Sequence, residues 1–259
     1  MRFLFFLQSL LAAVSIQAAP PAAGSTPAAT GSRVVSYNIK HGQGMDKKLD
    51  LHRTAETIRK LAPDLVALQE IDINCGRSGG VDQMAALGKM LEMHHAFGKF
   101  MDHDGGEYGL GILSKYPLLR SEAHRLPDGA EPRCALEIEV EIAGQRTSFV
   151  CIHLDWTSED IRLAQAKVLI EKLAKRPHPV VVLGDFNATR ESASHRLLSA
   201  HWTALATTEA APTFPSEAPE QQIDFILVPK GGPWEKITSE VIDDRLTSDH
   251  RPVLAVFPF

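Results

Sequence analysis

Residues 180–187, with the sequence VVVLGDFN, decide the fold, because a short apolar run ends abruptly in a glycine, a carboxylate and an amide. The run is β-branched and is bounded by Pro179 and Ala188, which predicts a strand buried on both faces. Chemistry in α/β proteins collects at the ends of such strands. Taken alone, Asp185 and Asn187 would more often only form a turn, so the other strand ends decide whether this one belongs to a site.

Several other segments repeat this pattern of an apolar run with polar groups at one end. They are 33–39, 65–70, 147–154, 223–228 and 248–256. The segment 135–142 (ALEIEVEI) alternates strictly, so we expect a strand with its apolar residues toward a core and its three glutamates toward water. A further strand is expected at 108–116, and helices are expected at 54–61, 81–93, 161–173 and 192–199.

Length and composition favour one domain with a sizeable core, since the chain has 259 residues, of which 44% are hydrophobic and 23% charged. Residues 1–18 are typical of a secretory signal peptide, because Arg2 precedes an apolar core. An uncleaved membrane anchor is the alternative, which the short apolar run disfavours. Residues 19–32 form a flexible Pro/Ala-rich leader, and 33–259 form the folded domain. We therefore expect an exported protein, periplasmic or extracellular.

The balance of charge argues against one class of partner. The net charge is −5, from 27 Lys and Arg against 32 Asp and Glu, so no basic surface dominates. Proteins that hold long nucleic acid by bulk electrostatics are usually basic, which disfavours tight non-specific binding. A local basic patch or a bound metal can still recruit phosphate.

The three cysteines, Cys75, Cys134 and Cys151, allow one disulfide at most. Cys151 lies in an apolar run and is expected to be a buried thiol. Cys75 and Cys134 both lie near expected loops, so a disulfide between them stays open. No Cys/His spacing in the sequence resembles a zinc site.

Polar residues at the strand ends carry the strongest functional signal. They are Asn38, Glu70, His153, Asp185, Asn187, Asp224, Asp249 and His250. Each has an ordinary alternative as a turn or cap residue, but the combination in this order is far more specific. The motifs YNI (37–39), LQEID (68–72), GILSKYP (111–117), HLD (153–155), GDFN (184–187), IDFI (223–226) and SDHRPV (248–253) resemble the endonuclease/exonuclease/phosphatase family of metal-dependent phosphoesterases.

The resemblance covers nearly all of residues 33–256 and implies an α/β fold. That fold is a four-layer sandwich, in which two mixed, mostly antiparallel β-sheets pack face to face with helices outside. The site would then lie at one rim of the sandwich. Hydrolysis of a phosphate ester needs a hard cation, and a carboxylate-rich site without thiolate selects Mg²⁺, Mn²⁺ or Ca²⁺. The resemblance implies Glu70 as the first metal ligand, with Asn38 and Asp249 holding or orienting the metal shell.

The resemblance also implies the catalytic residues. Asp185 would position and deprotonate the attacking water, and Asn187 would orient that water or the phosphate. His153 and His250 would donate to phosphoryl oxygens. Asp224 would pair with His250, which fixes its tautomer and favours its charged form.

Five other basic residues have weaker support. Arg77 and Arg133 are expected in loops, where contact with substrate phosphate and simple solvation at the surface are about equally supported. For His41, His103 and His124 a surface position or a satisfied structural role is the better interpretation.

We therefore expect a secreted, metal-dependent hydrolase of phosphodiester bonds, nuclease-like and monomeric, acting on nucleic acid, a lipid head group or a small phosphate ester. A sphingomyelinase-like lipid phosphodiesterase and a phosphomonoesterase are the alternatives. The sequence shows no aromatic hairpin for inserting into a bilayer, so no stable membrane insertion is expected after signal removal. A binding protein on the same fold that has lost catalysis is the alternative of another class, although none of the eight site residues is missing.

Overall fold

In the computed structural model, which describes residues 31–207 and 211–259, the apolar run forms the strand β8 of a six-stranded sheet. The sheet, named sheet II, has the strand order β5-β6-β7-β8-β11-β9. Its strands are β5 (Arg120–Arg125), β6 (Cys134–Ile142), β7 (Gln145–His153), β8 (Val180–Asp185), β9 (Trp202–Ala204) and β11 (Asp224–Pro229). Because β8 lies inside the sheet, all of its residues are buried.

A second sheet of seven strands, named sheet I, has the order β10-β12-β13-β1-β2-β4-β3. Its strands are β1 (Ser32–Asn38), β2 (Leu65–Ile73), β3 (His94–His103), β4 (Gly106–Ser114), β10 (Ala206–Thr207), β12 (Thr238–Val241) and β13 (Val253–Phe257). The pair β1–β2 is parallel, whereas β1–β13 and β2–β4 are antiparallel. In sheet II the pair β7–β8 is parallel and the other pairs are antiparallel, so both sheets are mixed and mostly antiparallel, as the resemblance implies.

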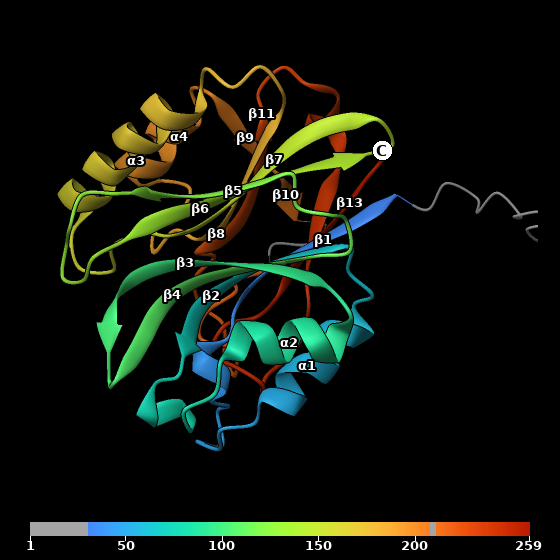
Figure 1. Cartoon of the computed structure of the whole chain (residues 1–259). Coiled ribbons are helices and arrows are strands. Elements are labelled where there is room, and N and C mark those ends of the chain that lie inside the picture. The colour runs from blue at the N-terminus through green and yellow to red at the C-terminus, as the bar shows by residue number, and fades with distance from the viewer. Residues whose placement is uncertain (1–30, 208–210) are drawn as a thin grey trace, which may run out of the picture. The chain divides into compact units, whose positions relative to one another are not determined.

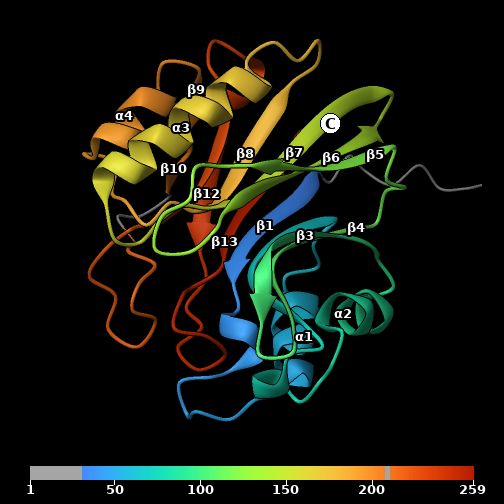
Figure 2. The same ribbon diagram turned by 60° about the vertical axis from the view of Figure 1, so that its left-hand side comes forward.

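Four helices complete the layers: α1 (Leu51–Lys60), α2 (Gln83–Leu91), α3 (Glu159–Leu173) and α4 (Ala193–Leu198). Figures 1 and 2 show α1 and α2 on the outer side of sheet I, and α3 and α4 on the outer side of sheet II. The largest apolar cluster fills the space between the sheets, where Leu110, Ile138, Phe149 and Phe257 are buried. One further cluster lies beneath each helix pair. This arrangement confirms the predicted four-layer sandwich.

Residues 31–259 form one compact unit. The predicted signal peptide, 1–18, and residues 19–30 of the predicted leader lie outside the described residues. Ser32, which the sequence analysis placed in the leader, is the first residue of β1. No helix within residues 31–207 and 211–259 is long and apolar enough to cross a membrane.

Some details differ from the sequence-based expectations. The strand β3 (His94–His103) was not predicted, because charged residues and histidines interrupt its apolar positions. All three cysteines are buried free thiols, so Cys75 and Cys134 form no disulfide. The expectation that three glutamates of β6 face water is wrong, since Glu141 is exposed while Glu137 and Glu139 are buried.

Glu137 is buried because partners surround its carboxylate. Arg176 Nε and Nη2 donate to it at 3.0 and 2.7 Å, His124 Nε2 lies at 2.6 Å, and Ser148 Oγ donates at 2.7 Å. Burial alone would raise the pKa of Glu137, but these hydrogen bonds lower it to about 2. His124 thereby has a satisfied structural role, one of the two interpretations of that residue.

This cluster predicts a pH-dependent loss of stability in the variant Glu137→Gln. The folded-state pKa lies below the ordinary value of 4.5, so the stabilisation is present above pH 4.5 and is lost as the pH falls from there toward 2. We expect Glu137→Gln to lower the free energy of unfolding by about 3 kcal/mol at pH 7, with a smaller difference below pH 4.

Urea unfolding of the domain at several pH values measures this difference. Glu141→Gln, an exposed glutamate of the same strand, serves as the matched control and should change the free energy of unfolding by less than about 0.5 kcal/mol. A loss for Glu137→Gln that is the same at every pH would contradict the pairing.

Candidate active site

The predicted site residues meet at one rim because of how the strands pair. The strands β1 and β2 are parallel with Asn38 opposite Gln69, and β7 and β8 are parallel with His153 opposite Asp185. Parallel neighbours end at the same edge of a sheet, so these polar ends lie together. Asp224 begins β11 directly opposite Asp185. The segment before β13 brings in Asp249 and His250. These two residues line one cavity of about 410 Å³ together with His153 and Asp185.

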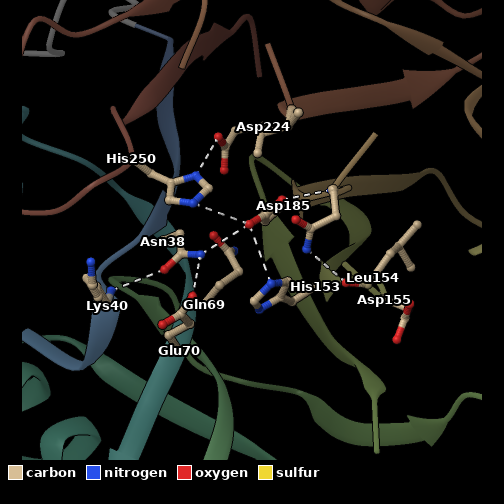
Figure 3. A network of polar contacts seen from close by, with 12 residues as sticks. Asn38, Lys40, Gln69, Glu70, His153, Leu154, Asp155, Asp185, Asp224 and His250 are labelled. Atoms are coloured by element: carbon tan, nitrogen blue, oxygen red, sulfur yellow. Dashed lines mark hydrogen bonds and ion pairs between the residues drawn. The ribbon is translucent and has the colours of Figure 1, made fainter. Parts of the chain in front are cut away.

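Asp185 is the centre of the polar network in Figure 3. Its carboxylate is 1% exposed, and Asn38 Nδ2 donates to its Oδ2 at 3.1 Å. His153 Nε2 and His250 Nε2 lie 3.4 and 3.6 Å from the same oxygen. The backbone N–H of Asn187 donates to Oδ1 at 2.8 Å. Burial raises the pKa of Asp185. The charge of His250 opposes this rise, and the charge of Asp224 adds to it.

The two histidines carry different charges. Burial would lower the pKa of His250, but Asp224 and Asp185 raise it well above the ordinary value. Its Nδ1 donates to Asp224 Oδ2 at 2.9 Å, which is the predicted pairing. Burial and the nearby Arg133 lower the pKa of His153, which is therefore neutral. The site can thus offer one charged and one neutral imidazole to a substrate.

Glu70 enters the site through a local distortion of β2. The pairing of β2 with β4 is irregular between Leu68 and Ile71, and Glu70 has φ +62°, which is rare for a residue other than glycine. Asn38 Nδ2 donates to Glu70 Oε1 at 3.0 Å. Burial raises the pKa of Glu70, and Asp249 raises it further. Backbone strain of this kind concentrates at functional sites.

The residues around Glu70 fit a hard divalent cation. The carboxylates of Glu70 and Asp249 line one cavity and repel each other electrostatically, a repulsion that a cation between them would remove. Asn38 Oδ1 accepts from the backbone N–H of Lys40 at 3.1 Å and retains a second lone pair. An all-oxygen donor set of this kind suits Mg²⁺, Mn²⁺ or Ca²⁺.

A second group of possible ligands, Asp185, Asp224 and His250, has donor atoms within 4.8 Å of one another. There the charged imidazole of His250 already compensates the two carboxylates. Glu70, by contrast, is held by the neutral amide of Asn38, which makes this carboxylate the candidate ligand of a metal.

Asn187 lines the cavity with φ +48°, and its side-chain Nδ2 donates to the carbonyl of Leu154 at 3.0 Å. One amide hydrogen and the amide oxygen stay available for water or phosphate. Gly184, three residues before Asn187, has to be a glycine, since a Cβ there would lie 2.0 Å from the carbonyl oxygen of Ile152.

Both predicted arginines line the cavity. Arg77 donates twice to Asp72, at 2.8 and 2.7 Å, and its guanidinium lies 5.0 Å from the ring centroid of Tyr108. Arg133 is only 1% exposed, so a solvated surface position is wrong for it. Its guanidinium lies over the ring of Phe100, and its Nε has no hydrogen-bond partner among the described residues.

Sequence reasoning missed several residues of the site. They are Lys40, which pairs with Asp249, and the cavity-lining residues His103, Tyr108, Trp156 and Phe214. Lys40 and Trp156 follow Asn38 and His153 within three residues in the sequence. Their nearness to predicted site residues could have indicated that they belong to the site. His103 comes from the unpredicted strand β3, Tyr108 from the start of the expected strand 108–116, and Phe214 from a Pro-rich stretch, and no pattern in these segments pointed to the site.

The chain is similar to known proteins in sequence and in fold. The chain is 27% identical over 240 residues to YbhP of Escherichia coli, an uncharacterised protein, with 86% of this chain and 94% of YbhP covered. The fold of this chain matches that of mannosyl-6-phosphatase Bt3783 of Bacteroides thetaiotaomicron with a TM-score of 0.72 at 18% identity, over 86% of this chain and 98% of that one.

The fold also matches truncated Caenorhabditis elegans TDP2 with a TM-score of 0.68 at 20% identity, over 88% of this chain and 97% of that one. At these identities the structures establish the fold alone. The profile of the Endonuclease/Exonuclease/phosphatase family matches residues 35–250, a span that includes every predicted site residue. The chain therefore belongs to the endonuclease/exonuclease/phosphatase family.

Proposed function

We propose that the protein is an exported, metal-dependent phosphoesterase that hydrolyses phosphodiester bonds by in-line attack of an activated water. The observation that carries this proposal is the buried carboxylate of Asp185, which lies beside one charged and one neutral histidine. A carboxylate with a raised pKa can accept a proton near neutral pH, which a general base must do. Export rests on the signal-like residues 1–18 alone.

Each side chain has a task that follows from its position. Asp185 accepts the proton of the attacking water, and the backbone N–H of Asn187 holds its carboxylate in place. His250, held by Asp224, presents Nε2 to a phosphoryl oxygen as a charged donor. His153 lines the cavity with Nε2 3.4 Å from Asp185 Oδ2, and as a neutral imidazole it can donate its one proton to a second phosphoryl oxygen. Preorganised donors of this kind stabilise the charge of the transition state.

Glu70, Asp249 and the amide of Asn38 would hold the metal. When bound, a hard divalent cation supplies charge neutralisation for the phosphoryl oxygens and the leaving oxygen. The chain's own part is to hold the carboxylates of Glu70 and Asp185 in fixed positions relative to each other, since Asn38 Nδ2 donates to both.

A phosphomonoesterase is the second candidate, and one observation favours it. The buried guanidinium of Arg133 lines the cavity, where its Nη1 lies 3.1 Å from Glu131 Oε2, and a terminal phosphate carries an additional negative charge that this guanidinium can match. The structural relative Bt3783, named a mannosyl-6-phosphatase, shows that phosphomonoester hydrolysis occurs on this fold.

Hydrolysis of bis(p-nitrophenyl) phosphate beside p-nitrophenyl phosphate, with Mg²⁺ and with chelator, tests the proposal. Turnover of the diester that chelator abolishes would support it. Faster turnover of the monoester would favour the second candidate. No turnover of either compound, or turnover that chelator leaves unchanged, would contradict a general metal-dependent phosphoesterase.

The variant Asp185→Asn should fold normally and lose about 10²- to 10⁴-fold in kcat, because it removes the proton acceptor at nearly constant volume. Initial rates with the diester measure the loss, and thermal melting checks the fold. Asp243→Asn, which changes a surface aspartate that is 58% exposed, is the matched control and should keep wild-type rates. Wild-type turnover by Asp185→Asn would rule out Asp185 as the base.

The variant Glu70→Gln should weaken metal binding by about tenfold or more, since it removes a charged ligand while its amide oxygen can still accept from Asn38. A titration of the rate with Mg²⁺ measures the shift in half-saturation. Glu240→Gln, an exposed glutamate of β12, controls for the change in net charge. An unchanged titration for Glu70→Gln would reject Glu70 as a ligand.

A further inference from the structure

Lys40 lies beside the candidate metal site in an unusual backbone conformation. It follows β1 by two residues, and both Lys40 and His41 have positive φ, of 46° and 44°. Such values are uncommon outside glycine and cost conformational energy. The backbone N–H of Lys40 donates to Asn38 Oδ1 at 3.1 Å, which ties this turn to the site (Figure 3).

The turn directs the ammonium of Lys40 onto Asp249. Lys40 Nζ lies 2.7 Å from Asp249 Oδ2, and the two side chains are 33% and 21% exposed. The other oxygen, Oδ1, has a single contact among residues 31–207 and 211–259, with Ser248 Oγ at 3.4 Å. The ammonium of Lys40 therefore already binds Oδ2 of Asp249, whereas Oδ1 has the weaker contact.

Glu70, which lines the same cavity, forms no ion pair within the described part of the chain. Asn38 donates to it at 3.0 Å through a neutral amide. A cation shared by Glu70 and Asp249 would lie close to the ammonium of Lys40 and be repelled by it, and at such short range little screening applies. Lys40 and a divalent cation thus need the same carboxylate.

We propose that the ammonium of Lys40 competes with a divalent cation for the negative charge of Asp249, so that the metal binds more weakly while Lys40 holds this carboxylate. This inference rests on the proposed metal-dependent function and assigns to Lys40 the control of metal affinity. Lys40 neutralises Asp249 in the metal-free protein. Divalent cations then bind more weakly than the carboxylates alone would allow.

Isothermal titration of the metal-free protein with Mn²⁺, and separately with Mg²⁺, tests the competition without any measurement of activity. We expect the variant Lys40→Gln to bind Mn²⁺ about three- to tenfold more tightly than wild type, because it removes both the ion pair and the repulsion. The variant Lys40→Arg keeps the charge and should stay within about twofold of wild type.

The matched control is Lys47→Gln, which makes the same change of net charge nearby. Lys47 is exposed and forms no ion pair within the part of the chain that the structure describes. The variant Lys47→Gln should alter the Mn²⁺ affinity by less than about twofold, since exposed charges are screened by salt. Tightening confined to Lys40→Gln supports the proposal.

Three results would overturn it: an unchanged or weaker affinity in Lys40→Gln, equal tightening in Lys47→Gln, or equal tightening in Lys40→Arg. These results leave the proposed function intact as long as wild type binds the ion and chelator abolishes turnover. A wild-type protein that binds no divalent cation would contradict the proposed function and this inference together.

Discussion

The burial of the Asp185 carboxylate is the constraint on which the rest of the site depends. Removing an ionised carboxylate from water is costly unless donors replace the water. Here Asn38 comes from sheet I, while His153 and the backbone of Asn187 come from sheet II and its following loop. The compensation exists only when the two sheets are packed together. Folding and assembly of the site are therefore one event.

The same rim gathers strained backbone. Lys40, Glu70 and Asn187 all have positive φ, and each such residue costs on the order of 1–3 kcal/mol. Three apolar clusters hold these positions, one between the sheets and one beneath each helix pair. A rigid scaffold lets the rim place two histidines in different charge states a few ångströms from one carboxylate, and it aims Glu70 and Asp249 into one cavity. Hydrolysis of a phosphate ester needs this division of tasks.

Much of this could be predicted from the sequence, because the apolar strands β1, β2 and β8 have clear patterns and end in polar residues. The site residues could be named because they lie at those ends. The edge strand β3 could not be predicted, since its polar residues mask the pattern of its apolar positions. Glu137 was placed in water, and the burial of Arg133 was left open, because both depend on partners distant in the sequence. The contact of Lys40 with Asp249 joins residues 209 positions apart, which no local pattern reveals.

The stereochemical course at phosphorus tests most directly whether water attacks in a single in-line step, which the role of Asp185 as the base requires. A phosphodiester made chiral by sulfur is hydrolysed in ¹⁸O-labelled water, and the configuration of the product is read by ³¹P NMR. Water activated by Asp185 attacks in line in a single step, which predicts inversion at phosphorus. Retention would mean two successive displacements through a covalent intermediate, for example on His153, and would contradict the assignment of Asp185 as the base.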